Sequence, residues 1–126
     1  MAQRLAKDLV LVKIDQDKMA GGQAVAGALR DFQSGGIPWF ATIDPARGLL
    51  VDEGEGSWSL ERAAVLSTSD GPDGNVGCPM TPTERDHFIR TLRQARKAMT
   101  DKDIEFIAAA LHEYARETIG ERADAD

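Results

Sequence analysis

The chain has 126 residues, a formal charge of -6 and 42% hydrophobic residues, which is enough apolar content for one modest core. The negative charge argues against nucleic acid as a partner, because phosphates attract clustered Lys and Arg. No apolar run approaches the roughly 20 residues that span a bilayer, and the N-terminal MAQRLAKD lacks the apolar centre of a signal peptide. We therefore expect a single domain over residues 1–126, no membrane partner and a cytoplasmic location.

In chain order, residues 4–8 are expected to end a helix, and residues 9–15 (LVLVKID) to form a strand. An almost continuous apolar run with β-branched residues suits a strand buried in a parallel sheet. Residues 24–32 predict a short helix, in which Val25, Leu29 and Phe32 repeat every three to four residues. Residues 37–44 (IPWFATID) predict a second strand, which ends in the turn DPARG at 44–48.

The stretch 49–61 (LLVDEGEGSWSLE) either extends a hairpin or forms a separate flap, in which Trp58 packs against the edge of the core. A further strand is expected over residues 62–69. The sequence DGPDGNVGCP at 70–79 is typical of a loop, since Gly, Pro, Asn and Asp favour turns.

The last third predicts two amphipathic helices. Thr81 can cap the first, Pro82 suits its first position, and Glu84 completes a capping box. Its apolar stripe consists of Phe88, Ile89, Leu92, Ala95 and Met99. A second stripe, formed by Ile104, Ile107, Ala108, Leu111 and Ala115, predicts a helix over residues 101–119 that starts at Thr100 or Asp101. We expect both helices to pack on the preceding sheet and the tail at 121–126 to be frayed.

The single cysteine, Cys78, and the two histidines, His87 and His112, limit the metal and redox chemistry of this chain. One cysteine excludes an intrachain disulfide and a metal cage built from several cysteines. The histidines fall on different predicted helices without further ligands, so solvated or packed histidines are favoured over a metal site. We expect no metal and no cofactor.

This order of elements resembles the C-terminal half of the thioredoxin fold. Four motifs carry the resemblance, in sequence: VKID at 12–15, GGIPW at 35–39, SDGPDGN at 69–75 and Gly-Cys-Pro at 77–79. In that fold a strand and a helix lead to an Ile-Pro step whose proline is cis, then to an antiparallel hairpin and a last helix. The resemblance covers residues 4–93 and is closest to bacterial thioredoxin-like proteins. It implies an α/β, incomplete thioredoxin-like fold with a mixed sheet, to which the helix at 100–119 is an addition.

The resemblance also implies a binding edge. Pro38 would be the cis proline, and Ile37 would offer its backbone N–H and C=O to an extended peptide, with Gly36 and Trp39 beside them. A trans proline in a loop before an edge strand is the alternative. The loop with Cys78 approaches the proline in this fold, so Cys78 is either an auxiliary thiol or, as we favour, a partly buried and inert cysteine.

Two parts of the thioredoxin fold are missing from this sequence. It has no Cys-x-x-C motif, and it begins inside the helix that follows that motif. The absent second strand would lie between residues 9–15 and residues 39–44, and its loss leaves buried backbone groups unpaired at about 1 to 3 kcal/mol each. Three explanations are open: a longer protein with an upstream start and with it the option of export, a re-paired sheet, or a second chain that fills the gap.

Three functions remain open at this point. In the first, the chain is part of a thiol–disulfide oxidoreductase and is inactive alone because it lacks the dithiol. In the second, it is a noncatalytic module that binds a peptide or partner protein at the Ile37–Pro38 edge. In the third, it is a structural protein that forms a homodimer through an exposed strand edge.

Overall fold

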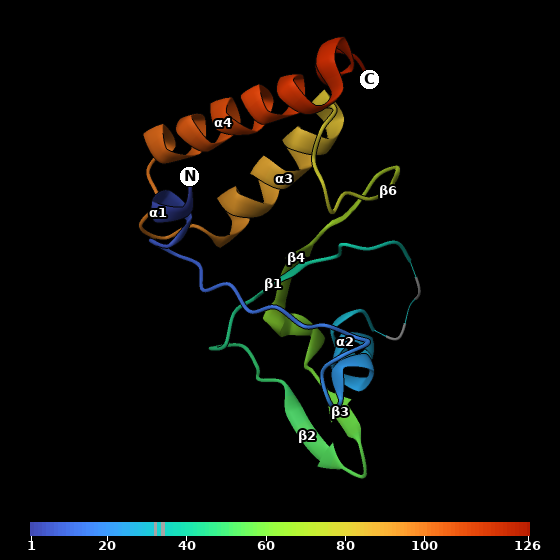
Figure 1. The fold of residues 1–126 in the computed structure, drawn as a ribbon. Helices are drawn as coiled ribbons and strands as arrows, with labels where there is room; N and C mark the ends of the chain where they lie inside the picture. The colour runs from blue at the N-terminus through green and yellow to red at the C-terminus, as the bar shows by residue number, and fades with distance from the viewer. Residues whose placement is uncertain (32, 34) are drawn as a thin grey trace.

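The structure, a computed structural model, describes residues 1–31, 33 and 35–126, and it combines helices with short antiparallel strands (Figure 1). The helices are α1 (Ala2–Leu5), α2 (Gly22–Leu29), α3 (Pro82–Ala95) and α4 (Asp101–Ile119), and the 3-10 turns are η1 (Arg62–Ala64) and η2 (Gly120–Asp124). The strands are β1 (Ala41–Ile43), β2 (Val51–Gly54), β3 (Ser57–Ser59), β4 (Val65–Thr68), β5 (Asp70–Gly71) and β6 (Gly74–Asn75). The mixed α and β character is as expected, whereas the thioredoxin-like arrangement stays a prediction.

Helices α3 and α4 form one end of the molecule, and both begin with a capping box. Thr81 accepts a hydrogen bond from the backbone N–H of Glu84, and the Glu84 carboxylate accepts one from the N–H of Thr81, as predicted. Thr100 and Asp103 form the same box before α4, which has the predicted bounds. The buried apolar cluster lies at this end and consists of Leu92, Met99, Ile104 and Ile107.

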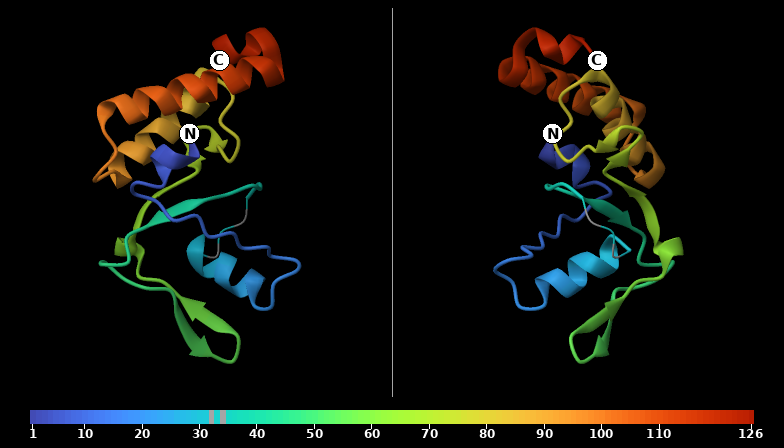
Figure 2. Two further views of the ribbon diagram at one scale, coloured as in Figure 1. Left: turned by 60° about the vertical axis from the view of Figure 1, so that its left-hand side comes forward. Right: turned by 90° about the vertical axis from the view of Figure 1, so that its right-hand side faces the viewer.

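The two long helices are layered on one another rather than side by side on a sheet. Helix α3 contacts β4, and α4 packs on the outer side of α3 (Figures 1 and 2). The expectation that both helices pack on a sheet is therefore wrong for α4. The β1–β4 pair is only three to four residues long and α3 covers it, so α4 packs on α3 instead of on the sheet.

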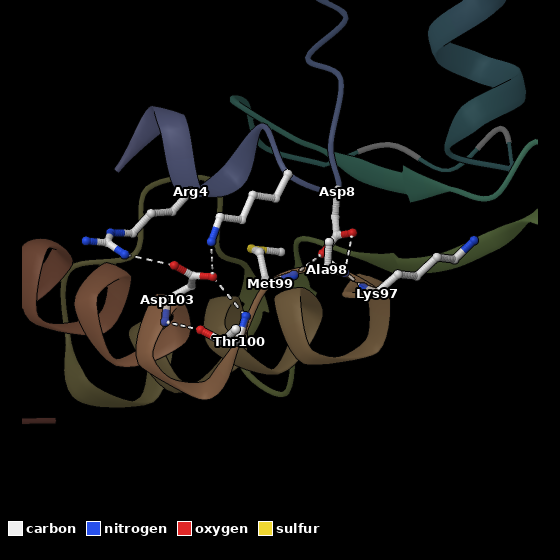
Figure 3. Close-up of polar contacts among 8 residues, drawn as sticks. Arg4, Asp8, Lys97, Ala98, Met99, Thr100 and Asp103 are labelled. Carbon is white, nitrogen blue, oxygen red and sulfur yellow. Dashed lines mark hydrogen bonds and ion pairs between the residues drawn. The ribbon is translucent and has the colours of Figure 1, made fainter.

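Carboxylates anchor the N-terminal segment to this helical end (Figure 3). Asp103 is 2% exposed and accepts hydrogen bonds from Arg4 Nη1 at 2.8 Å and Lys7 Nζ at 2.7 Å. The Lys7 ammonium, the backbone N–H of Thr100 and the Arg4 guanidinium hold the pKa of Asp103 well below its ordinary value. Helix α1 and the turn after it are therefore attached to the start of α4 by ion pairs between residues 96 and 99 positions apart in the sequence.

A second carboxylate, Asp8, lies at the turn between α3 and α4. It accepts three backbone N–H groups, from Lys97 at 2.9 Å, Ala98 at 2.8 Å and Met99 at 2.8 Å (Figure 3). Burial raises the pKa of Asp8, but these three donors outweigh it and leave the pKa below its ordinary value. The chain is thus fixed in place where segment 9–15 begins.

The C-terminal tail is ordered, contrary to the expectation that it frays. Residues Gly120–Asp124 form η2, and Ala123 is fully buried. Asp124 pairs with His112 at 2.6 Å and with Arg116 at 2.9 Å. The tail folds back because these partners lie about two and three turns earlier on α4, a tertiary arrangement that composition alone does not reveal.

Strands β1 and β4 pair antiparallel, with Ala41 opposite Thr68 and Thr42 opposite Ser67. This confirms the predicted antiparallel pair, although each strand is shorter than predicted and residues 62–64 form η1 instead. The turn after β1 is present, with the N–H of Arg47 donating to the carbonyl of Asp44 at 3.0 Å. The predicted 70–79 loop contains the short β5–β6 hairpin.

Segment 9–15 is not a strand, and the predicted mixed sheet does not form among the described residues. Val10, Leu11 and Val12 are 91%, 80% and 73% exposed, and the described strands pair only in antiparallel twos. A strand needs hydrogen bonds to a neighbouring strand. With no strand beside it among the described residues, an apolar run with strand composition stays a coil.

The stretch 49–61 forms a hairpin of its own, β2–β3, beside α2. Trp58 is half-buried there and lies near Gly21 at the start of α2, so its predicted packing role holds. Helix α2 begins two residues before the predicted helix and ends at Leu29, where Arg62 donates to the last carbonyls. Phe32, the last residue of the predicted apolar repeat, lies outside the described residues.

Candidate functional site

The residues predicted to bind a peptide, Gly36, Ile37, Pro38 and Trp39, form a continuous stretch that leads into β1, called here the proline edge. The Ile37–Pro38 peptide bond is cis, as expected. Ile37 is 76% exposed, and Gly36 and Pro38 are exposed as well. Among the described residues, the backbone N–H and C=O of Ile37 have no hydrogen-bond partner. An exposed apolar side chain and backbone groups without a partner among the described residues thus occur at the same residue.

Asn75 fixes the backbone of the proline edge through two hydrogen bonds. Its Nδ2 donates to the carbonyl of Gly36 at 3.0 Å and to that of Pro38 at 2.8 Å, so it spans Ile37 on both sides. Ser69, fully buried, donates its hydroxyl to Asn75 Oδ1 at 2.6 Å and accepts from the backbone N–H of Phe40 at 3.0 Å. The side chains of Ser69, directly after β4, and of Asn75, in β6, therefore fix the backbone of the proline edge.

Trp39 is fixed by its neighbours. Its Nε1 donates to Asp70 Oδ2 at 3.1 Å, and the Arg30 guanidinium carbon lies 5.0 Å from the centre of its ring. Arg30 also donates to the carbonyl of Gly36 at 3.2 Å. Trp39 is half-buried, so it supports the edge and offers part of its ring at the surface.

The loop that contains Cys78 touches the proline edge through Gly77. A Cβ atom at Gly77 would overlap the carbonyl of Pro38, so only glycine permits this approach. The expected approach of this loop to the proline is therefore present. Cys78 is exposed, however, and not partly buried as predicted, because its side chain extends from a surface loop rather than into the core.

The remaining candidate ligands do not come together. His87 Nε2 lies 2.9 Å from the carbonyl of Thr68, and His112 pairs with Asp124, so both histidines have packing roles. Asp15 accepts the N–H groups of Asp17 and Lys18 in a local turn. In the part of the chain that the structure describes, no group of three or more His, Cys, Asp or Glu side chains is placed to hold a metal ion.

Two small hollows lie on this surface, and Ile37 lines neither of them. One of about 160 Å³ lies between the β5–β6 turn and the start of α3, and another of about 110 Å³ lies beside β1, between Leu9 and Ile43. Ligand pockets for small molecules usually hold about 300–1,000 Å³. The exposed proline edge suits an extended chain on the surface better than an enclosed small molecule.

Sequence patterns located Ile37 and Pro38 but not the residues that hold them. Asn75 and Ser69 come from more than 30 residues further along the chain, and the only local signal was the turn composition around them.

No family model, curated protein or solved structure that we compared with this chain matches it. Among the described helices, none is long and apolar enough to cross a membrane.

Proposed function

We propose that this chain is a thioredoxin-like module that binds an extended peptide segment of a partner protein along the proline edge, and that it does not exchange disulfides alone. The observation that carries the proposal is Ile37, whose side chain is 76% exposed while its backbone groups have no partner among the described residues. Such a residue can pair with an added strand and bury its side chain at the same time.

The rigidity of the edge supports this function. Asn75 bonds to the carbonyls on both sides of Ile37, and the Cα of Gly77 lies directly against Pro38. A preformed edge loses little conformational entropy when a peptide binds, so more of the interaction energy appears as affinity. The exposed Ile37 side chain is therefore held in position before a peptide binds, and the proline edge need not rearrange to bind it.

Binding rather than catalysis is favoured by the chemistry of the chain. Thiol–disulfide exchange by a dithiol needs two cysteines, whereas this chain has one. Cys78 is exposed and lies one residue after Gly77, so it is the group through which a redox function would have to act. An oxidoreductase role would require a second thiol from outside this chain.

The binding proposal can be tested by NMR with reduced and carboxymethylated insulin B chain, an extended peptide without free thiols. We expect its addition to shift the backbone amide signals of Gly36, Ile37 and Trp39. Ile37→Asp should weaken binding at least about tenfold, because an apolar contact is replaced by a charge. Leu49→Asp is the matched control, since Leu49 is 64% exposed but lies outside the edge. Shifts confined to other surfaces would contradict the proposal.

An insulin-reduction assay tests the absence of activity. With dithiothreitol as reductant, we expect this chain and its Cys78→Ser variant to leave the rate of insulin reduction unchanged. Acceleration by the wild type that disappears in Cys78→Ser would overturn the claim of inactivity. In that case the chain would be a thiol catalyst that works through its single cysteine.

A further inference from the structure

The C-terminal tail, residues 120–126, lies against the start of α3 (Figures 1 and 2). Asp126 Oδ1 accepts a hydrogen bond from the backbone N–H of Thr83 at 2.9 Å. The carbonyl of Ala123 accepts one from Arg85 Nη1 at 2.8 Å, and Ala123 itself is fully buried. The tail is therefore docked on α3 at two points.

Arg85 joins this tail to the loop that touches the proline edge. The same Nη1 that donates to Ala123 also donates to the carbonyl of Met80. Met80 lies three residues after Gly77, which lies directly against the carbonyl of Pro38. One guanidinium group thus holds two carbonyls from segments far apart in the sequence, and the docked tail keeps that group at the end of the loop.

The loop between these contacts is short. Only two residues separate Gly77 from Met80, and one of them is Pro79, whose ring fixes its φ angle. On the far side of Gly77, the N–H of Val76 donates to the carbonyl of Ser69 at 2.6 Å, so that side is anchored independently of the tail. A displacement at Met80 is therefore passed to Gly77 over a short and restricted segment.

We infer that the C-terminal tail, docked by the ion pairs of Asp124, controls how firmly the proline edge is held, and that Arg85 is the positioning residue that connects them. With the tail docked, Ala123 keeps the guanidinium at the Met80 carbonyl and the loop keeps Gly77 in place. When the tail is released, Arg85 loses one of its two acceptors and the loop loses a restraint. Such coupling is reciprocal, so a peptide bound at the edge favours the docked tail. Only this last consequence rests on the proposed function.

NMR of the whole chain tests the coupling without a peptide. Asp124→Lys should release the tail, because it replaces the carboxylate that pairs with His112 and Arg116 by a like charge. Release should speed hydrogen exchange of the Thr83 amide, which bonds to the tail, at least about threefold. It should also shift the amide signal of Gly77.

Glu117→Lys is the matched control, since it makes the same change of charge at an exposed position of α4 outside the tail's ion pairs. It should leave the Thr83 exchange and the Gly77 signal unchanged. Because the Asp124 side chain is 44% exposed, its lysine variant should stay folded, which far-UV circular dichroism checks. Exchange at Thr83 that stays at the wild-type rate in Asp124→Lys would overturn the inference, because these ion pairs would then not dock the tail.

A double-mutant cycle tests the role of Arg85. Arg85→Met keeps an apolar stem and removes the donors, so it should shift the Gly77 signal by itself, whereas Arg90→Met, at an exposed arginine of α3, should not. In the Arg85→Met background, Asp124→Lys should add no further shift at Gly77, because the connection is already broken. A further shift as large as in the wild type would overturn the role of Arg85.

Peptide binding gives the reciprocal test. Saturation of the wild type with carboxymethylated insulin B chain should slow exchange of the Thr83 amide, which lies outside the proline edge. Asp124→Lys should weaken this binding about fivefold, the lower end of typical couplings, since Glu84 still holds the N–H of Met80. A peptide that does not bind would contradict the proposed function alone. Release of the tail with the Gly77 signal and the peptide affinity unchanged would overturn the inference and leave the proposed function standing.

Discussion

The helical end of the molecule and segment 9–15 are built from similar apolar residues and bury them to opposite extents. On α4, Ile104 and Ile107 are 1% and 0% exposed, whereas Val10 and Leu11 are 91% and 80% exposed. A helix forms its hydrogen bonds within one segment and needs only one packing face. A strand needs a neighbour for its backbone before its side chains can be buried. Apolar content alone therefore does not bury a segment, and the missing neighbour decides the outcome.

The largest expected effect is a contrast between an isoleucine in the buried cluster and an isoleucine at the exposed proline edge. Ile107→Ala should lower the free energy of unfolding by about 3 kcal/mol, because it leaves a cavity in the buried cluster. Ile37→Ala at the exposed proline edge should change it by less than about 0.5 kcal/mol. Urea denaturation of both variants measures this. Equal losses would mean that the proline edge is as well packed as the helical core.

A smaller effect concerns the ion pairs that join α1 to α4. Asp103→Asn should destabilise the protein at neutral pH by less than Ile107→Ala, because the amide can still accept a hydrogen bond but no longer pairs with Lys7 and Arg4. Because the folded-state pKa of Asp103 lies below its unfolded value of about 3.9, its contribution is full above that value and is lost as the pH falls below it.

Urea denaturation between neutral pH and acid measures that contribution. The gap between wild type and Asp103→Asn should be constant above about pH 5 and narrow at lower pH. Four other carboxyl groups with lowered pKa values titrate in both proteins and cancel in the difference; they are Asp8, Glu84, Asp124 and Asp126. Asp86→Asn, an exposed change on α3, should show no such gap. A gap of constant size down to the most acid condition would contradict the assignment.

The helical end could be predicted from sequence because its signals are local. Thr81 and Glu84 lie three residues apart, and the apolar spacing of α4 gave its bounds at 101 and 119. The tail could not be predicted, since burial of Ala123 depends on where α4 places it. The prediction of a strand over residues 9–15 is wrong because the composition of the segment favours a strand, while its structure depends on a neighbouring strand that composition does not supply.

The candidate site also has one part that the sequence predicts and another part that it does not. The Ile-Pro step and its flanking glycines are visible in the sequence, and the structure leaves Ile37 and Pro38 exposed there. Their supports could not be predicted, because Asn75 reaches Gly36 across 39 residues and Trp39 reaches Asp70 across 31. Contacts between distant residues follow from the fold and not from local spacing. A sequence can therefore mark an exposed stretch such as this one before it indicates which distant residues hold it.

The smallest expected effect lies in the β2–β3 hairpin, at the opposite end of the molecule from α3 and α4 (Figure 1), and tests whether this hairpin unfolds separately from the helical end. Its two-residue loop is Glu55 and Gly56, and both have positive φ, +55° and +77°. Glycine adopts such angles freely, and asparagine tolerates them better than glutamate does. Glu55→Asn should therefore stabilise the hairpin by about 0.5 kcal/mol.

Hydrogen exchange of the hairpin amides is the measurement that shows this gain. We expect exchange at Val51 and Ser59 to slow about twofold, while the urea midpoint reported by α3 and α4 stays the same, because the buried cluster lies wholly in the helical end. Glu55→Gln removes the same charge without the favourable backbone preference and should leave exchange unchanged. An equal gain in the hairpin and in α3 and α4 would mean that the two regions unfold as one unit, and the contrast between them would then concern burial alone.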